Sequence, residues 1–185
     1  MKVLRRDGQP DLVVPSESIE QRKLFAWAKH ADTRYPPVNL MYAVPNGGSR
    51  QVVEAAIMKA EGVMPGVPDI NLPWPNDTHA GLCIELKRVA FALHEKNPTQ
   101  FGTISEDQLK WLVRLNAAGH HAVVCRGCEH AQATVEAYCL DDEPRLAYLN
   151  QWWVDLDPKM LKRVTKAKVG GTRKRKPALR RRAVR

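Results

Sequence analysis

The sequence predicts an α/β protein in which a mixed β-sheet is flanked by helices. Amphipathic helical patterns alternate with short strand patterns along the chain, which indicates helices packed on a sheet. Hydrophobic residues make up 44% of the 185 residues, enough for the core of one domain. The expected elements are a helix over residues 16–31, a strand over 38–44, a helix over 50–61, strands over 66–72 and 82–87, a helix over 105–119, a strand over 121–125 and a helix over 129–140.

The first helix is marked by its N-terminus. Ser16 is a good N-cap after Pro15, and apolar residues recur at helical spacing behind it. Glu17 and Glu20 lie in the first turn, where a carboxylate interacts favourably with the helix dipole. Helix stabilisation alone therefore accounts for both glutamates.

Prolines at positions 36 and 37 end this region, and a strand is expected to follow them. The sequence Pro-Asn-Gly-Gly at 45–48 is a strong turn signal. The next helix has one apolar face and a glycine stop at Gly62.

A hairpin is the centre of the predicted sheet. In its second strand Glu85 and Lys87 share one face and aliphatic residues share the other, because successive strand side chains alternate. The connecting segment 73–81 is rich in turn-forming residues. A hairpin centred in this segment puts Asp69 opposite Glu85, so that two carboxylates and an ammonium converge on one face.

That grouping suits a hard divalent cation. Mg²⁺ prefers oxygen ligands and is usually held by one or two carboxylates together with water and substrate phosphate. A lysine beside the cation can polarise the attacking water or offset charge on a phosphate. An amphipathic hairpin with a solvated polar face has the same alternation, so spacing alone leaves both interpretations open.

Two features follow the hairpin. Residues 88–103 are long for a simple connection, and we expect them to form a flap over the site. Ser105 and Gln108 have the spacing of a helix capping box, with the serine at the N-cap and the glutamine at N3.

Four motifs in this order resemble the virus-type replication-repair nuclease (VRR-NUC) family of the PD-(D/E)xK nuclease superfamily. They are a glutamate in the first helix, Gly-Val-Pro-Asp at 66–69, Glu-Leu-Lys at 85–87 and Ser-Glu-Asp-Gln at 105–108. The match extends over about residues 16–140. It implies a restriction-endonuclease-like core and a metal-dependent DNA endonuclease, with branched, flapped or junction DNA as the substrate.

The resemblance also implies how the central motifs would act. Asp69 and Glu85 would hold Mg²⁺ or Mn²⁺ with help from the backbone carbonyl of Leu86. Lys87 would position or activate the water that attacks the phosphodiester.

The outer motifs would have supporting roles. Glu20 would be an accessory ligand or orient the site, with Glu17 as the alternative. Gln108 would contact the substrate or support the metal ligands from outside the coordination sphere. Stand-alone relatives are typically phage or bacterial proteins, which implies the cytoplasm of a bacterium or of a phage-infected cell, and a homodimer is one assembly that the family implies.

The charge of the chain is divided unevenly. Residues 159–185 contain 13 Lys or Arg and no Asp or Glu, whereas the first 158 residues contain 16 basic and all 20 acidic residues. We expect a disordered basic tail that binds phosphate backbones without reading sequence. The tail residues expected to bind nucleic acid are Lys159, Lys162, Arg163, Lys166, Lys168, Arg173, Lys174, Arg175, Lys176, Arg180, Arg181 and Arg182.

These observations predict an N-terminal arm over residues 1–15, a nuclease domain over 16–140, a linker over 141–158 that packs on the domain, and the tail. The absence of a long apolar run argues against a membrane span, and the N-terminus has no signal-peptide pattern. Two other functions fit the tail: a noncatalytic nucleic-acid-binding module and a phage structural component. Neither has a need for Asp69, Glu85 and Lys87 together.

Overall fold

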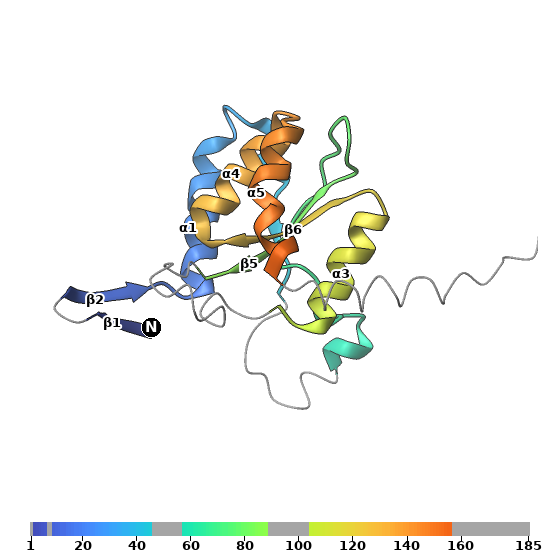
Figure 1. Cartoon of the computed structure of the whole chain (residues 1–185). Coiled ribbons are helices and arrows are strands. Elements are labelled where there is room, and N and C mark those ends of the chain that lie inside the picture. The colour runs from blue at the N-terminus through green and yellow to red at the C-terminus, as the bar shows by residue number, and fades with distance from the viewer. Residues whose placement is uncertain (1, 7–8, 46–56, 89–103, 157–185) are drawn as a thin grey trace, which may run out of the picture.

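A computed structural model describes residues 2–6, 9–45, 57–88 and 104–156, and within them the side chains of residues 15–45, 57–88 and 104–151. A four-stranded sheet runs through the middle of the domain (Figure 1). Its strands, in spatial order, are β3 (Tyr42–Ala43), β4 (Ile70–Leu72), β5 (Leu82–Lys87) and β6 (His121–Arg126). β4 is antiparallel to both β3 and β5, and β6 is parallel to β5, which confirms the predicted mixed sheet.

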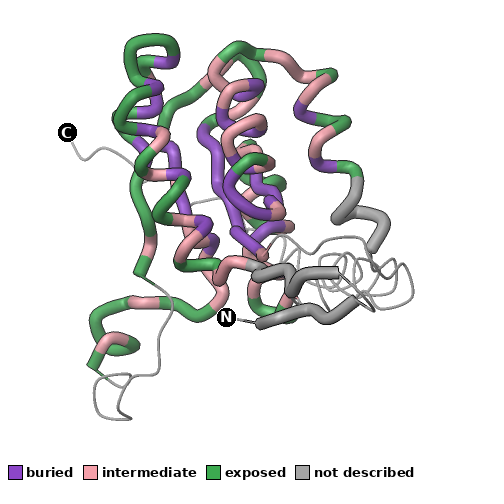
Figure 2. Tube along the Cα trace, turned by 90° about the vertical axis from the view of Figure 1, so that its left-hand side faces the viewer, coloured by how far each residue is buried: buried purple, intermediate pink, exposed green. Residues whose placement is uncertain are grey.

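Helices cover both faces of the sheet. Figure 1 shows α1 (Glu17–Ala31), α4 (Gly127–Cys139) and α5 (Glu143–Leu156) on one side and α3 (Glu106–Ala117) on the other. Buried residues lie in the central strands and on the helix faces that meet them (Figure 2). The α/β class predicted from the alternating patterns is therefore confirmed.

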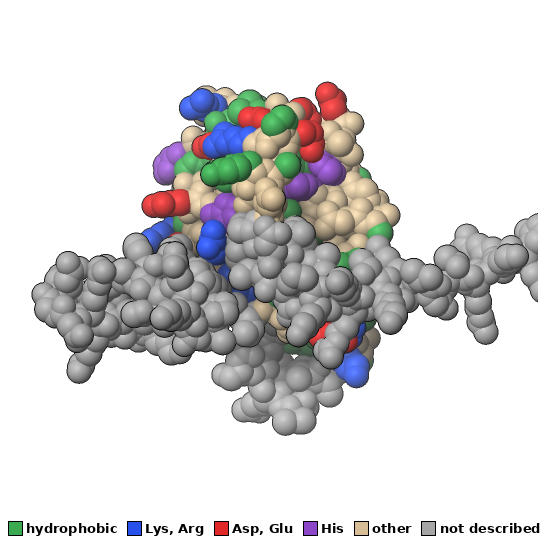
Figure 3. Space-filling model, in the orientation of Figure 1, with side chains coloured by type: hydrophobic (Ala, Val, Ile, Leu, Met, Phe, Trp, Pro, Cys, Tyr) green, Lys and Arg blue, Asp and Glu red, His purple; other side chains and the backbone are tan. Residues whose placement is uncertain are grey.

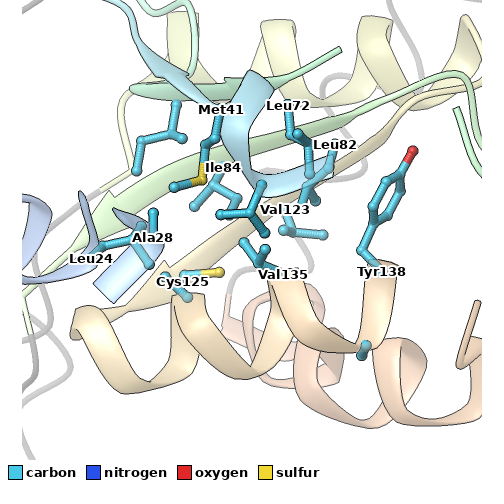
Figure 4. Close-up of a cluster of buried hydrophobic side chains, with 14 of the residues drawn as sticks. Leu24, Ala28, Met41, Leu72, Leu82, Ile84, Val123, Cys125, Val135 and Tyr138 are labelled. Carbon is cyan, nitrogen blue, oxygen red and sulfur yellow. The ribbon is translucent and has the colours of Figure 1, made fainter. Parts of the chain in front are cut away.

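The larger core lies between the sheet and the α1, α4 and α5 side. Aliphatic residues of β4, β5 and β6 pack there against one stripe of each helix, as Figure 4 shows in close-up. The labelled side chains of this core are Leu24, Ala28, Met41, Leu72, Leu82, Ile84, Val123, Cys125, Val135 and Tyr138. A smaller cluster joins α3 to the opposite face through Leu109 and Leu112.

The N-terminal boundaries of α1 and α3 are as predicted. The Ser16 hydroxyl accepts a hydrogen bond from the backbone N–H of Ile19 at 3.3 Å. The Ser105 capping box is complete, with both reciprocal hydrogen bonds present. These caps satisfy backbone donors that have no partner inside the helix.

The prediction of a strand over residues 38–44 was wrong for its first half. The chain forms a 3₁₀ helix, η1 (Pro36–Leu40), and β3 begins only at Tyr42. The two prolines have fixed backbone angles and occupy the first helical positions, where a missing N–H is not needed.

Two further segments precede and follow the four-stranded sheet along the chain. Residues in the predicted arm form a separate antiparallel pair, β1 (Lys2–Arg6) and β2 (Gln9–Val14). Most of the predicted linker forms α5, which docks through the buried side chains of Leu146 and Asn150. No helix in the described ranges is long and apolar enough to cross a bilayer.

Three predictions fall on residues outside the described ranges. They are the glycine turn with the first part of the helix predicted over 50–61, the flap predicted over 88–103 except for its first residue, and the basic tail predicted over 159–185. Residues 57–60 are helical, as expected for the end of that second helix.

Candidate active site

The hairpin has the register that its sequence predicts. Ile70 pairs with Ile84 and Leu72 with Leu82, so the next position along puts Asp69 across from Glu85. Asp69 stands just before β4, and Glu85 lies near the carboxyl end of β5. The two carboxyl side chains consequently meet on the face of the sheet that α3 covers.

Glu85 is held from two sides. The residue is 1% exposed, and its Oε1 accepts hydrogen bonds from the Lys87 ammonium at 2.7 Å and from Nε2 of Gln108. Lys87 is itself only 6% exposed. A buried carboxylate with a buried ammonium beside it is costly unless hydrogen bonds satisfy both groups, which these contacts do in part.

The electrostatic state of Glu85 reflects this burial. Desolvation raises the pKa of Glu85 to about 8, the carboxylate of Asp69 adds to the rise, and the Lys87 ammonium partly opposes it. A hydrogen bond between the two carboxyl groups contributes to the same shift.

Asp69 is oriented by the neighbouring strand. Its Oδ2 accepts a hydrogen bond from the backbone N–H of Leu86 at 2.9 Å. The N–H and the carbonyl of one residue in an extended strand point to the same edge, so the Leu86 carbonyl also faces the Asp69 side of β5. Two side-chain carboxyls and one backbone carbonyl are thereby directed to a common region.

Gln108 joins the helix cap to the site. Its Oε1 accepts from the backbone N–H of Ser105 at 2.8 Å, while its Nε2 donates to Glu85. The sequence offered helix capping and a site contact as alternative explanations. The same side-chain amide makes both contacts, using its oxygen for the cap and its nitrogen for the carboxylate.

Gly66 explains how the loop before Asp69 reaches α3. Its φ is +78°, and a Cβ at this position would lie 2.6 Å from the backbone carbon of Asp107. Only glycine combines this backbone angle with so close an approach. The indole N–H of Trp111 donates a hydrogen bond to the Pro65 carbonyl at 3.1 Å, which also holds this loop against α3.

Glu20 lies in a different setting. It is 3% exposed, accepts a hydrogen bond from the Cys128 backbone N–H at 2.9 Å, and lies 3.7 Å from the Lys23 ammonium. It therefore stabilises the N-terminus of α4, where a carboxylate interacts favourably with the helix dipole. Glu17 is exposed, so of the two glutamates only Glu20 is buried.

The donor set at Asp69 and Glu85 fits a hard divalent cation. Among the described residues, no group of three or more His, Cys, Asp or Glu side chains could hold a metal ion. Two carboxylates with water and substrate phosphate are the usual Mg²⁺ environment. A cation between the two carboxyls would also replace their mutual repulsion, which raises the pKa of Glu85, with attraction.

Sequence reasoning did not single out Tyr42 and Asn71, which lie on the same face. The Asn71 Nδ2 donates to the Tyr42 hydroxyl at 2.7 Å, and the two residues are cross-strand partners. The signal that could have found Asn71 is its spacing of two from Asp69, which puts both on one face of β4. Tyr42 had no such signal, since the partner strand of β3 was not predictable.

Comparisons with known proteins bear on the family and the fold of the chain. The sequence model of the VRR-NUC domain matches residues 15–129. A solved structure described as a VRR_NUC domain protein superposes with a TM-score of 0.54 at 23% sequence identity, over 69% of this chain and 90% of that chain. At this identity the second comparison shows a common fold alone. No curated protein matches the chain.

Proposed function

The chain belongs to the VRR-NUC domain family, whose members are generally nucleases, and we propose that it is a metal-dependent DNA endonuclease with its active site at Asp69, Glu85 and Lys87. The observation that carries the proposal is the convergence of these three side chains on one face of the sheet. Buried charges in such a group cost stability, so a catalytic use explains them better than packing does.

We assign the metal site to Asp69, Glu85 and the Leu86 carbonyl, with Mg²⁺ or Mn²⁺ as the cation. When bound, such a cation supplies Lewis-acid polarisation of the phosphate and a water of lowered pKa. Asp69 is held for this role by the Leu86 N–H, and Glu85 by Gln108. Both ligands are thus oriented before the cation arrives.

Lys87 is assigned to the charge that develops on the phosphate or to the attacking water. Its Nζ lies 2.7 Å from Oε1 of Glu85 and the residue is almost fully buried, which fixes the position of the side chain. Glu20 is assigned a supporting role through the N-terminus of α4, and Gln108 a positioning role.

The substrate we propose is DNA with a branch, flap or junction. On the face drawn in Figure 3, acidic and basic side chains are interspersed over the described surface. The concentrated positive charge of the sequence lies in residues 159–185, and we assign sequence-independent DNA attraction to that tail. Homodimer formation stays a prediction, which sedimentation equilibrium of the full chain tests.

The test separates cleavage from binding. We expect Asp69→Ala and Lys87→Ala each to abolish cleavage while DNA affinity stays close to wild type, because the tail supplies much of the affinity. Asp32→Ala, at the exposed end of α1, is the matched control and keeps full activity. Wild-type turnover by either site variant would remove the assignment, and DNA binding by the wild type without cleavage would favour a noncatalytic binding module.

A further inference from the structure

A row of side chains crosses the sheet next to the candidate active site. Tyr42 of β3, Asn71 of β4 and Cys83 of β5 occupy directly paired positions. Asn71 donates to the Tyr42 hydroxyl at 2.7 Å, and its Oδ1 lies 3.7 Å from the Cys83 sulfur. The row is parallel to the one formed by Asp69 and Glu85.

The two rows lie on the same face. Asn71 follows Asp69 by two positions on one strand, and Cys83 precedes Glu85 by two on the next. Same-face neighbours along a strand are about 7 Å apart. The Tyr42 end of its row is therefore close to the carboxylates, on the β3 side of the site.

Helix α3 covers only part of this face. It packs on β5 and β6, where Leu109 and Leu112 bury Cys83. At the other end of the row Tyr42 is 48% exposed, although it belongs to the sheet. An open aromatic surface thus adjoins the catalytic carboxylates.

The ring of Tyr42 is also fixed in place. A surface tyrosine usually directs its hydroxyl to water, but here the hydroxyl accepts a hydrogen bond from Asn71. Anchoring the hydroxyl reduces the rotamer freedom that a ligand would otherwise have to remove on binding. The exposed part of the ring is consequently preorganised for a flat partner.

From this geometry we propose that Tyr42 is a stacking platform for a nucleobase that flanks the scissile phosphate. The proposal rests on the nuclease function proposed above, because it takes the phosphate at Asp69 and Glu85 as its reference point. Aromatic rings stack on any base, and the base must first leave its own stack. The substrate class that this platform favours therefore has an unpaired nucleotide beside the cleavage point, as a flap or a single strand has.

The experiment measures stacking without cleavage. Full-length protein is titrated into oligodeoxynucleotides that carry 2-aminopurine in a single strand or at a flap junction, with chelator present. We expect wild-type protein to quench the fluorescence and Tyr42→Leu to lose the quenching, with affinity weaker by roughly 5- to 150-fold. High salt screens the attraction of the tail and leaves the stacking contribution visible.

Two variants serve as controls. Tyr42→Phe keeps the ring and loses only the anchoring hydroxyl, so it should keep the quenching. Tyr148→Leu removes a tyrosine that is 80% exposed on α5, on the far side of the sheet, and should behave as wild type. Thermal unfolding of each variant shows that the fold is intact.

The proposal is wrong if Tyr42→Leu quenches and binds like wild type, or if Tyr42→Phe loses as much as Tyr42→Leu. This readout is independent of the nuclease assignment. Quenching that depends on Tyr42 in a protein that never cleaves would remove the nuclease and leave the platform. Metal-dependent cleavage with no effect of Tyr42→Leu on quenching would keep the nuclease assignment and remove the stacking platform.

Discussion

The double role of Gln108 leads to a prediction that separates its two contacts. Glutamate also serves at the N3 position of a capping box, so Gln108→Glu keeps an oxygen for the Ser105 N–H. It removes the Nε2 donor to Glu85 and puts a third carboxyl in its place. Ser105→Ala makes the opposite change, because it removes the capping hydroxyl and leaves the amide beside Glu85.

The expected magnitudes follow from the contacts. A hydrogen bond to a buried carboxylate contributes about 1.5–3 kcal/mol, which in a transition state corresponds to roughly a 10- to 150-fold change in rate. We therefore expect Gln108→Glu to cleave DNA more slowly by this factor, with a pH profile moved to higher pH because another carboxylate raises the pKa of Glu85 further. Ser105→Ala should lose about 1 kcal/mol of stability and keep its cleavage rate.

The assay is single-turnover cleavage across pH, with urea unfolding of the same preparations. Wild-type stability, a wild-type cleavage rate and an unchanged pH profile in Gln108→Glu would show that the amide only caps α3. A slow Ser105→Ala variant that is still folded would show that the cap itself fixes the site geometry.

Three further predictions concern the loop, the pH dependence and the tail. Gly66→Ala should destabilise the protein by about 1–3 kcal/mol more than Gly62→Ala, and it should also slow cleavage. Both glycines have a positive φ, but only at Gly66 would the added Cβ meet the backbone of α3. Urea unfolding and cleavage rates of the two variants test this. In metal-free protein, Glu85 keeps a proton between about pH 4.5 and 8 that the unfolded chain releases. The free energy of unfolding of the wild type should therefore fall with rising pH, relative to that of Glu85→Gln, by up to about 1.4 kcal/mol per pH unit. If urea titrations give the two proteins the same pH dependence, the raised pKa of Glu85 is contradicted. Truncation after residue 158 should weaken DNA binding and flatten its salt dependence, and an unchanged slope would show that the tail is not the electrostatic anchor.

The hairpin at the centre of the fold was predictable from local signals. Strand side chains alternate with a period of two, and the turn-rich loop between the strands limits the register, so the pairing of Asp69 with Glu85 followed. The capping boundaries at Ser16 and Ser105 were predictable for the same reason, because a helix cap depends on residues within four positions of it.

Features that depend on distant parts of the chain were not predictable. The contact of Glu20 with the Cys128 N–H joins residues 108 positions apart, and no local pattern indicates it. The pairing of Tyr42 with Asn71 depends on the strand order of the folded sheet. Helix α5 did have a local signal, since Asp142 caps it by accepting from the Arg145 N–H at 3.1 Å, but the acidic composition of the segment favoured a linker.

The central claim is that Asp69 and Glu85 form a metal-dependent nuclease site. It is tested most directly by incubating the full chain and Asp69→Ala with linear duplex, single-stranded, flap and four-way-junction DNA, in Mg²⁺, in Mn²⁺ and in chelator. We predict cleavage by the wild type that requires a divalent cation, disappears in Asp69→Ala, and is fastest on a substrate with unpaired nucleotides. Cleavage that persists in chelator or in the variant, or binding to every substrate with no cleavage in either metal, would contradict the account.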